Sequence, residues 1–403
     1  MRPVPRDLSL STALWLACCG SPATPAPVAT PTPATPATPV TPVASPGEDD
    51  AEARRLAELP HRVVFADRIT YSYVLLLPGA GLVAPTREEL DAAVAKAFPD
   101  NLEDDEVVLL RGLIARPIRE FVATAAPEEL AEGAEDLLGF TAETHPRTPP
   151  SGPALIEAKV LADPDLTHEL TPDERASLAG RGTLLVLRAQ YRNQHAVRGF
   201  RLLQTLVRVI AAQRSALIHD PDTLETMGLA AFAARRLQTN LGNVADQIPV
   251  VPFPDPRHTG RFRLATRGMR RFGSVDLELD GLPGELPTLQ QATFFLHGLA
   301  RQMVDLGEFE AGFAAELPPT LTLHHSDCAA AYAGRPGNLP RCKDCPESVE
   351  LHLVERAAEP QDAISHVVAR AVATRPRSDQ RAYDHPQWVQ EALARVFGGP
   401  ASM

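Results

Sequence analysis

Short apolar runs and alternating apolar and polar positions predict most of the strands of this chain. In residues 275–279, apolar side chains alternate with acidic ones, as expected for a strand with one face exposed to solvent. Residues 69–77 are rich in β-branched and aromatic types and end at Pro78-Gly79, which breaks the run. Further runs predict strands over 106–115, 155–161, 183–189, 261–265, 320–323 and 349–354.

Apolar positions spaced three and four residues apart predict the helices. The strongest stripes lie in residues 197–214 and 289–306. Other helices are predicted over 85–98, 128–138, 224–237 and 361–374. Because strands and helices interleave, the predicted fold class is α+β, with a mixed, mainly antiparallel sheet or sheets and packed helices.

Residues 141–153 contain several prolines and form the strongest candidate for an internal boundary. One interpretation is a smaller α+β subdomain over 56–140 and a main α+β domain over 154–397. In the alternative interpretation, the chain forms one large domain and the proline-rich stretch is a surface loop.

The first nineteen residues have the composition of an export signal. A basic start is followed by the apolar run 8–17, which is too short to span a bilayer and is followed by Cys18 and Cys19. This region resembles the signal peptide and lipobox of bacterial lipoproteins, which implies a palmitate-type lipid on Cys19 or, in a different register, on Cys18. The alternatives are a soluble secretory protein cleaved near this point, or a start codon placed too early.

Residues 20–55 predict a disordered tether between the anchor and the folded body. Within them, 21–46 consist almost entirely of Pro, Thr, Ala and Val, which favours extended polyproline II structure over a packed core. We therefore expect a membrane-associated protein of the bacterial cell envelope, lipid-anchored to the outer membrane and facing the periplasm or the cell surface. An envelope protein is the partner that this location suggests.

The formal net charge of −12 makes nucleic acid an unfavourable partner, because acidic surfaces repel phosphate backbones. The run at 267–271 is basic and could bind an anion, although its composition is more typical of a solvated turn.

The loop 324–346 carries a candidate metal or disulfide site. His325, Cys328, Cys342 and Cys345 form two close pairs separated by a turn-rich segment, a spacing that suits a structural zinc ion. Export to an oxidising compartment favours a disulfide instead, with one of these three cysteines left over. The zinc ion and the disulfide both remain open, as does a third alternative in which neither forms. The sequence makes no cofactor certain.

The sequence His219-Asp220-Pro221-Asp222 follows a short apolar run, and the ends of strands often carry catalytic groups. It is also an ordinary turn sequence. No serine-hydrolase, zinc-protease, phosphate-loop or dinucleotide motif occurs in the chain. An envelope hydrolase would therefore need a site assembled from scattered residues such as His195, His219, Asp220 and Asp222.

Residues 266–273 read TRGMRRFG and precede the alternating acidic strand. This segment resembles a signature of uncharacterised bacterial lipoproteins of the myxobacterial type, which carry a domain of unknown function. The resemblance implies no known activity. The leading hypothesis is a non-enzymatic, lipid-anchored binding or envelope-associated protein; the alternatives are the envelope hydrolase and, from the resemblance, an immunity-type protective interaction protein.

Overall fold

The computed structural model describes most of the chain after residue 67. The described ranges are 68–118, 137–193, 196–237, 243–309, 320–332, 346–359, 367–374 and 383–398, with the single positions Leu317, Leu339 and Asp362. All of them belong to one compact unit, Glu48–Met403. The predicted signal peptide 1–19 and the predicted tether 20–55 lie outside the described residues.

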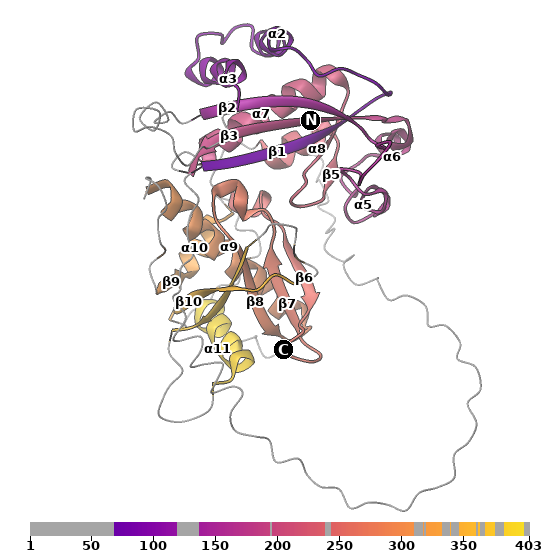
Figure 1. Cartoon of the computed structure of the whole chain (residues 1–403). Coiled ribbons are helices and arrows are strands. Elements are labelled where there is room, and N and C mark those ends of the chain that lie inside the picture. The colour runs from indigo at the N-terminus through magenta and orange to yellow at the C-terminus, as the bar shows by residue number, and fades with distance from the viewer. Residues whose placement is uncertain are drawn as a thin grey trace, which may run out of the picture. The chain divides into compact units, whose positions relative to one another are not determined.

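The first sheet is antiparallel throughout and has the strand order β2-β3-β1-β4-β5. Helix α7 packs against β1 and β3, as Figure 1 shows. The strands of this sheet are β1 (Arg68–Leu77), β2 (Leu137–Pro146), β3 (Thr183–Arg192), β4 (Leu217–His219) and β5 (Thr226–Met227). The helices around it are α2 (Arg87–Ala97), α3 (Asp105–Ala115), α7 (Ala196–Arg214) and α8 (Leu229–Arg236).

This sheet joins the two segments that the sequence analysis separated. Strand β1 comes from the segment 56–140, yet it pairs with β3 and β4 from the segment 154–397. Strand β2 extends into the proline-rich stretch, and Pro146 is its last residue. The boundary expected at 141–153 therefore does not separate two sheets, because backbone hydrogen bonds connect strands from both sides of it.

The second sheet has the order β6-β7-β8-β11-β10-β9. Its described pairs are antiparallel except β8 with β11, which is parallel. Helices α9 (Leu286–Phe309) and α11 (His385–Phe397) contact β8. The strands are β6 (Val250–Pro254), β7 (Phe262–Thr266), β8 (Asp276–Leu282), β9 (Leu321–His324), β10 (Ser348–Arg356) and β11 (Val368–Ala373). The two mainly antiparallel sheets with their helices confirm the predicted α+β class.

Apolar side chains on opposite faces of the first sheet belong to two clusters. Leu75 of β1 joins a large cluster that includes Leu279 of the second sheet, whereas Leu76 joins a smaller cluster with Val160 and Leu161. This division follows from the alternation of side chains along a strand.

The short elements are α5 (Ala158–Ala162), α6 (Pro172–Ser177), η2 (Leu178–Gly180), η4 (Val244–Asp246), η5 (Met269–Phe272) and α10 (His325–Ala330).

Several element predictions were wrong in type. Residues 106–115 form helix α3 and not a strand, because Val107, Leu110 and Ile114 lie on one buried helical face and Asp104 caps its start. In the range 155–161, the regular element is the short helix α5. Residues 368–373, predicted to be helical, form strand β11, which lies between β8 and β10.

Strand β8 is fully buried, contrary to the half-exposed strand that its alternating pattern predicts. Asp276, Glu278 and Asp280 share the polar face and are all less than 5 % exposed. The alternation identified the strand correctly, but Glu278 and Asp280 pair with arginines instead of water. Asp276 accepts hydrogen bonds from the Thr266 hydroxyl and the Met269 backbone N–H.

None of the helices in the described ranges combines the length and the hydropathy that crossing a lipid bilayer requires.

Candidate metal centre beside strand β8

Arginines from the neighbouring strands neutralise much of the acidic face of β8. Glu278 accepts hydrogen bonds from Arg263 of β7 and from Arg356 of β10, the latter at 2.7 Å. Arg356 also contacts Asp362. This part of the face is therefore a network of charge-assisted hydrogen bonds between buried groups.

The next acid of the strand, Asp280, lies in a group of possible metal ligands. One donor atom from each of Asp255, His258 and Asp280 lies within 4.8 Å of the other two. His385 adds a further imidazole, since its Nε2 is 2.6 Å from Asp280 Oδ1. We call Asp255, His258, Asp280 and His385 the β8 cluster.

The turn between β6 and β7 positions two members of the β8 cluster. Asp255 follows the last residue of β6, and its Oδ1 accepts the backbone N–H of Arg257 at 2.8 Å. Its Oδ2 accepts the backbone N–H of Gly281 at 2.7 Å, which ties the turn to β8. His258 is also held, because its Nδ1 lies 2.8 Å from the same oxygen.

The first turn of α11 positions His385. Asp384 caps the helix by accepting the backbone N–H of Gln387, which fixes the residue that follows the cap. The Tyr383 hydroxyl lies 2.7 Å from His385 Nδ1, and this contact leaves Nε2 directed at Asp280. The imidazole rings of His258 and His385 are stacked, with centroids 6.0 Å apart.

His385 Nε2 is paired with Asp280 Oδ1, whereas Asp280 Oδ2 is buried without a hydrogen-bond partner. Arg370 contacts the other oxygen, Oδ1, at 2.7 Å, and Arg257 lies 3.5 Å from Oδ2. Burial raises the pKa of Asp280, but His385 and Arg370 outweigh this effect and hold the pKa well below its ordinary value. Burial lowers the pKa of His385, against the attraction of Asp280.

Carboxylate oxygens and imidazole nitrogens together suit a divalent transition metal better than Ca²⁺ or Mg²⁺, which prefer oxygen ligands. Asp255, His258 and Asp280 supply three such donors, and His385 would be the fourth ligand of a closed zinc site if its Nε2 turned from Asp280 Oδ1 to the ion. The residues of the β8 cluster are not those that the cysteine spacing indicated, which lie in the loop 324–346.

Of the zinc or disulfide group predicted in the loop 324–346, the structure describes His325 and Cys328. Cys328 is a buried free thiol, packed so closely on α9 that a Cβ at Gly298 would lie 2.7 Å from its sulfur. The His325 ring lies edge-on to the ring of Phe397, with centroids 6.0 Å apart. Cys342 and Cys345 lie outside the described residues, so both the zinc and the disulfide interpretations remain predictions.

The candidate catalytic residues His219, Asp220 and Asp222 are each 2 % exposed or less. His219 Nδ1 lies 3.0 Å from the Thr226 hydroxyl, and burial lowers the pKa of the ring to about 4. Asp220 accepts hydrogen bonds from Tyr71 and Arg271. His195 lies outside the described residues.

Asp222 in turn accepts a hydrogen bond from Arg270 at 2.8 Å. Arg270 and Arg271 belong to the basic run that was expected to form a solvated turn, but Arg271 is fully buried. The acids after β4 explain the difference, since they supply buried partners for these two arginines. His219, Asp220 and Asp222 thus make buried polar contacts, and a catalytic role for them stays a prediction.

Comparisons with protein-family models, with curated proteins and with solved structures gave no match. No residue roles can therefore be transferred from relatives, and the resemblance of residues 266–273 to myxobacterial-type lipoproteins stays a prediction.

Proposed function

We propose that this chain is a lipid-anchored protein of the bacterial cell envelope whose folded body binds a zinc ion at the β8 cluster as a structural, non-catalytic site. The observation that supports the metal is the group of donor atoms from Asp255, His258 and Asp280, which lie within 4.8 Å of one another. Within this group, Asp280 Oδ2 is buried without a hydrogen-bond partner. A buried polar atom without a partner costs about 1–3 kcal/mol, and a cation bound to Asp280 Oδ2 would remove that cost.

The β8 cluster draws its ligands from three separate elements, which favours a structural role. Asp255 and His258 come from the turn after β6, Asp280 from β8 and His385 from α11. One ion would hold the start of α11 and the β6–β7 turn against the centre of the second sheet. Arg370 and His385 contact Asp280 Oδ1, so Oδ2, from which Arg257 lies 3.5 Å, is the oxygen that would coordinate the ion.

The predicted stoichiometry is one zinc ion per chain, measured by metal analysis after purification and dialysis against a weak chelator. We expect His258→Ala and His385→Ala to lose the ion, because each removes one imidazole ligand. Binding at one hundred times the dissociation constant stabilises the folded state by about 2.7 kcal/mol, so a chelator that strips the ion lowers the melting temperature by several degrees.

Cys328→Ala is the matched control, since Cys328 belongs to the alternative metal group in the loop 324–346. Retention of zinc in this variant and loss in His258→Ala would assign the ion to the β8 cluster. The opposite pattern would assign it to the cysteines, and a metal-free wild-type chain would reject both sites.

For the anchor, we expect the double variant Cys18→Ser, Cys19→Ser to leave the membrane fraction when the chain is expressed in a bacterial host. Without a thiol at either position, no lipid can be attached. The two single variants identify the modified residue, which we expect to be Cys19. Membrane recovery equal to that of the wild type in the double variant would contradict the lipid anchor.

A further inference from the structure

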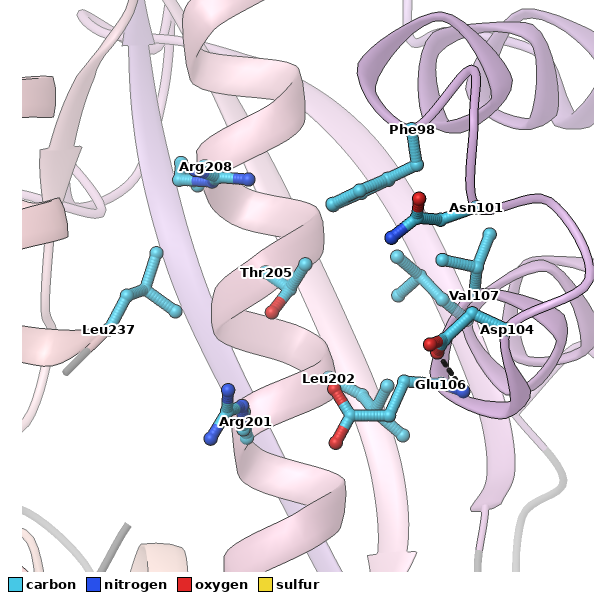
Figure 2. Close-up of a pocket in the computed structure, with 11 residues that line it drawn as sticks. Phe98, Asn101, Asp104, Glu106, Val107, Arg201, Leu202, Thr205, Arg208 and Leu237 are labelled. Atoms are coloured by element: carbon cyan, nitrogen blue, oxygen red, sulfur yellow. Dashed lines mark hydrogen bonds between the residues drawn. The ribbon is translucent and has the colours of Figure 1, made fainter. Parts of the chain in front are cut away.

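A pocket with a volume of about 290 Å³ lies over α7, far along the chain from the β8 cluster. Its walls are α7, the connection between α2 and α3, the start of α3, and the end of α8 (Figure 2). The lining residues are Phe98, Asn101, Asp104, Glu106, Val107, Leu110, Arg201, Leu202, Thr205, Arg208 and Leu237.

Arg201, Thr205 and Arg208 form the polar stripe of this pocket. Their spacing of four and three residues places them on one face of α7. All three are half-buried, in contrast to the fully buried Leu202, Leu203 and Leu206 of the same helix. Polar groups that line a concave site at intermediate burial fix the orientation of a bound ligand.

The Arg208 side chain is positioned to bind an anion. Its guanidinium carbon lies 5.8 Å from the centroid of the Phe98 ring, a cation–π contact that limits the motion of the side chain. No carboxylate of the described residues lies within ion-pair distance of Arg208. Figure 2 shows Arg208, Phe98 and Asn101 at one end of the pocket.

The rest of the pocket suits an apolar group. Val107, Leu110 and Leu202 are buried beneath it, and Leu237 is partly exposed at its edge. Glu106 and Arg201 lie toward the end opposite Arg208, as Figure 2 shows. Asp104 is occupied as the cap of α3, since it accepts the backbone N–H of Glu106 at 2.9 Å.

The two acidic residues restrict the charge of the ligand. Asp104 and Glu106 offset the charges of Arg201 and Arg208, so the lining offers no net positive charge to a dianion such as a phosphate monoester. A single negative charge can lie beside Arg208 and away from Glu106. We propose that this pocket binds a small monocarboxylate with an apolar body, with its carboxylate on Arg208 and Asn101 and its apolar part over Leu202 and Val107.

The test uses 3-phenylpropionate as the probe and titration calorimetry as the measurement. The protein is the full chain carrying Cys18→Ser and Cys19→Ser, which avoids detergent. The amide 3-phenylpropionamide has the same shape without the charge, and we expect it to bind at least tenfold more weakly. Arg208→Gln should weaken the carboxylate at least tenfold and leave the amide nearly unchanged.

Arg87→Gln is the matched control, because Arg87 is an exposed arginine of α2 that does not line the pocket. Thr205→Phe fills the pocket from its centre and should abolish binding of both probes, and circular dichroism checks that each variant is folded. Equal affinity of the wild type and Arg208→Gln, or no binding of the carboxylate at millimolar concentration, would overturn the proposal.

Discussion

Replacement of Arg271 by Met is expected to lower the free energy of unfolding by about 4 kcal/mol, enough to unfold many domains. Arg271 lies in η5 and is fully buried. Its Nη2 donates to the Tyr71 hydroxyl at 2.7 Å and to both oxygens of Asp220, at 3.1 and 3.2 Å. The variant would leave the buried Asp220 carboxylate with a much weaker set of partners.

The remaining contacts of the Arg271 side chain explain why the loss of unfolding free energy should exceed the loss from breaking one ion pair. Its Nε donates to the backbone carbonyl of Gly268 at 2.9 Å, and its guanidinium carbon lies 4.9 Å from the Tyr71 ring centroid. Although burial raises the pKa of Asp220, Arg271 and Arg236 lower it to about 2, so the acid stays charged near neutral pH.

The measurement is urea unfolding of the single variant and of the double variant Asp220→Asn, Arg271→Met. Removing both charges avoids an unpaired buried carboxylate, so we expect the double variant to be more stable than the single one. Arg87→Met, at an exposed position, is the control and should change stability by less than about 0.5 kcal/mol. A loss below 1 kcal/mol in Arg271→Met would show that the network contributes little to stability.

Hydrophobic patterns predicted the long elements of this chain well. Helices α7 and α9 and strands β1 and β3 were found close to their positions because each buries a continuous apolar face. Strand β11 was missed because it lies between two other strands and is buried on both faces, so its sequence VARAVA does not alternate cleanly.

The charged interior could not be predicted, because the partners of each buried charge lie far apart in the chain. The sequence around β8 shows the acids, but Arg263, Arg356 and Arg370 come from three other strands. Acidic residues on one side of a strand normally face solvent, and only the sheet order shows that arginines cover them here.

The sequence brings only two of the four residues of the β8 cluster close together along the chain. Asp255 and His258 are three residues apart in a turn rich in proline and glycine, a spacing that brings two ligands together. No local signal connects them to Asp280 or to His385, which starts the last helix. The cysteine spacing is the more conspicuous pattern, and it indicates the loop 324–346 instead.

Two buried histidines should make the protein sensitive to mild acid. Burial lowers the pKa of His219 and of His297 from 6.5 to about 4. The His297 Nε2 lies 2.8 Å from the backbone carbonyl of Ile248, so this nitrogen carries the proton and Nδ1 accepts from the Tyr332 hydroxyl. His219 faces the Thr226 hydroxyl and is followed by the charged Asp220.

The direction of the effect follows from proton uptake. Both rings are neutral in the folded state, whereas the unfolded chain protonates them below pH 6.5, so stability is full above this pH and falls as the pH drops toward 4. From the pKa values of 6.5 and about 4, each ring contributes a loss of about 2 kcal/mol between pH 7 and pH 4.5. The Asp220 pKa of about 2 affects stability only at lower pH.

His297→Gln should therefore reduce the pH dependence even though it lowers stability at pH 7. We expect the difference in unfolding free energy between pH 7 and pH 4.5, measured in urea, to shrink by about 2 kcal/mol relative to the wild type. His145→Gln is the control, because the His145 side chain is 42 % exposed and should leave that difference unchanged. The glutamine keeps an N–H donor for Ile248 but cannot take up a proton, so an unaltered pH dependence would mean that His297 is not the group that destabilises the fold in acid.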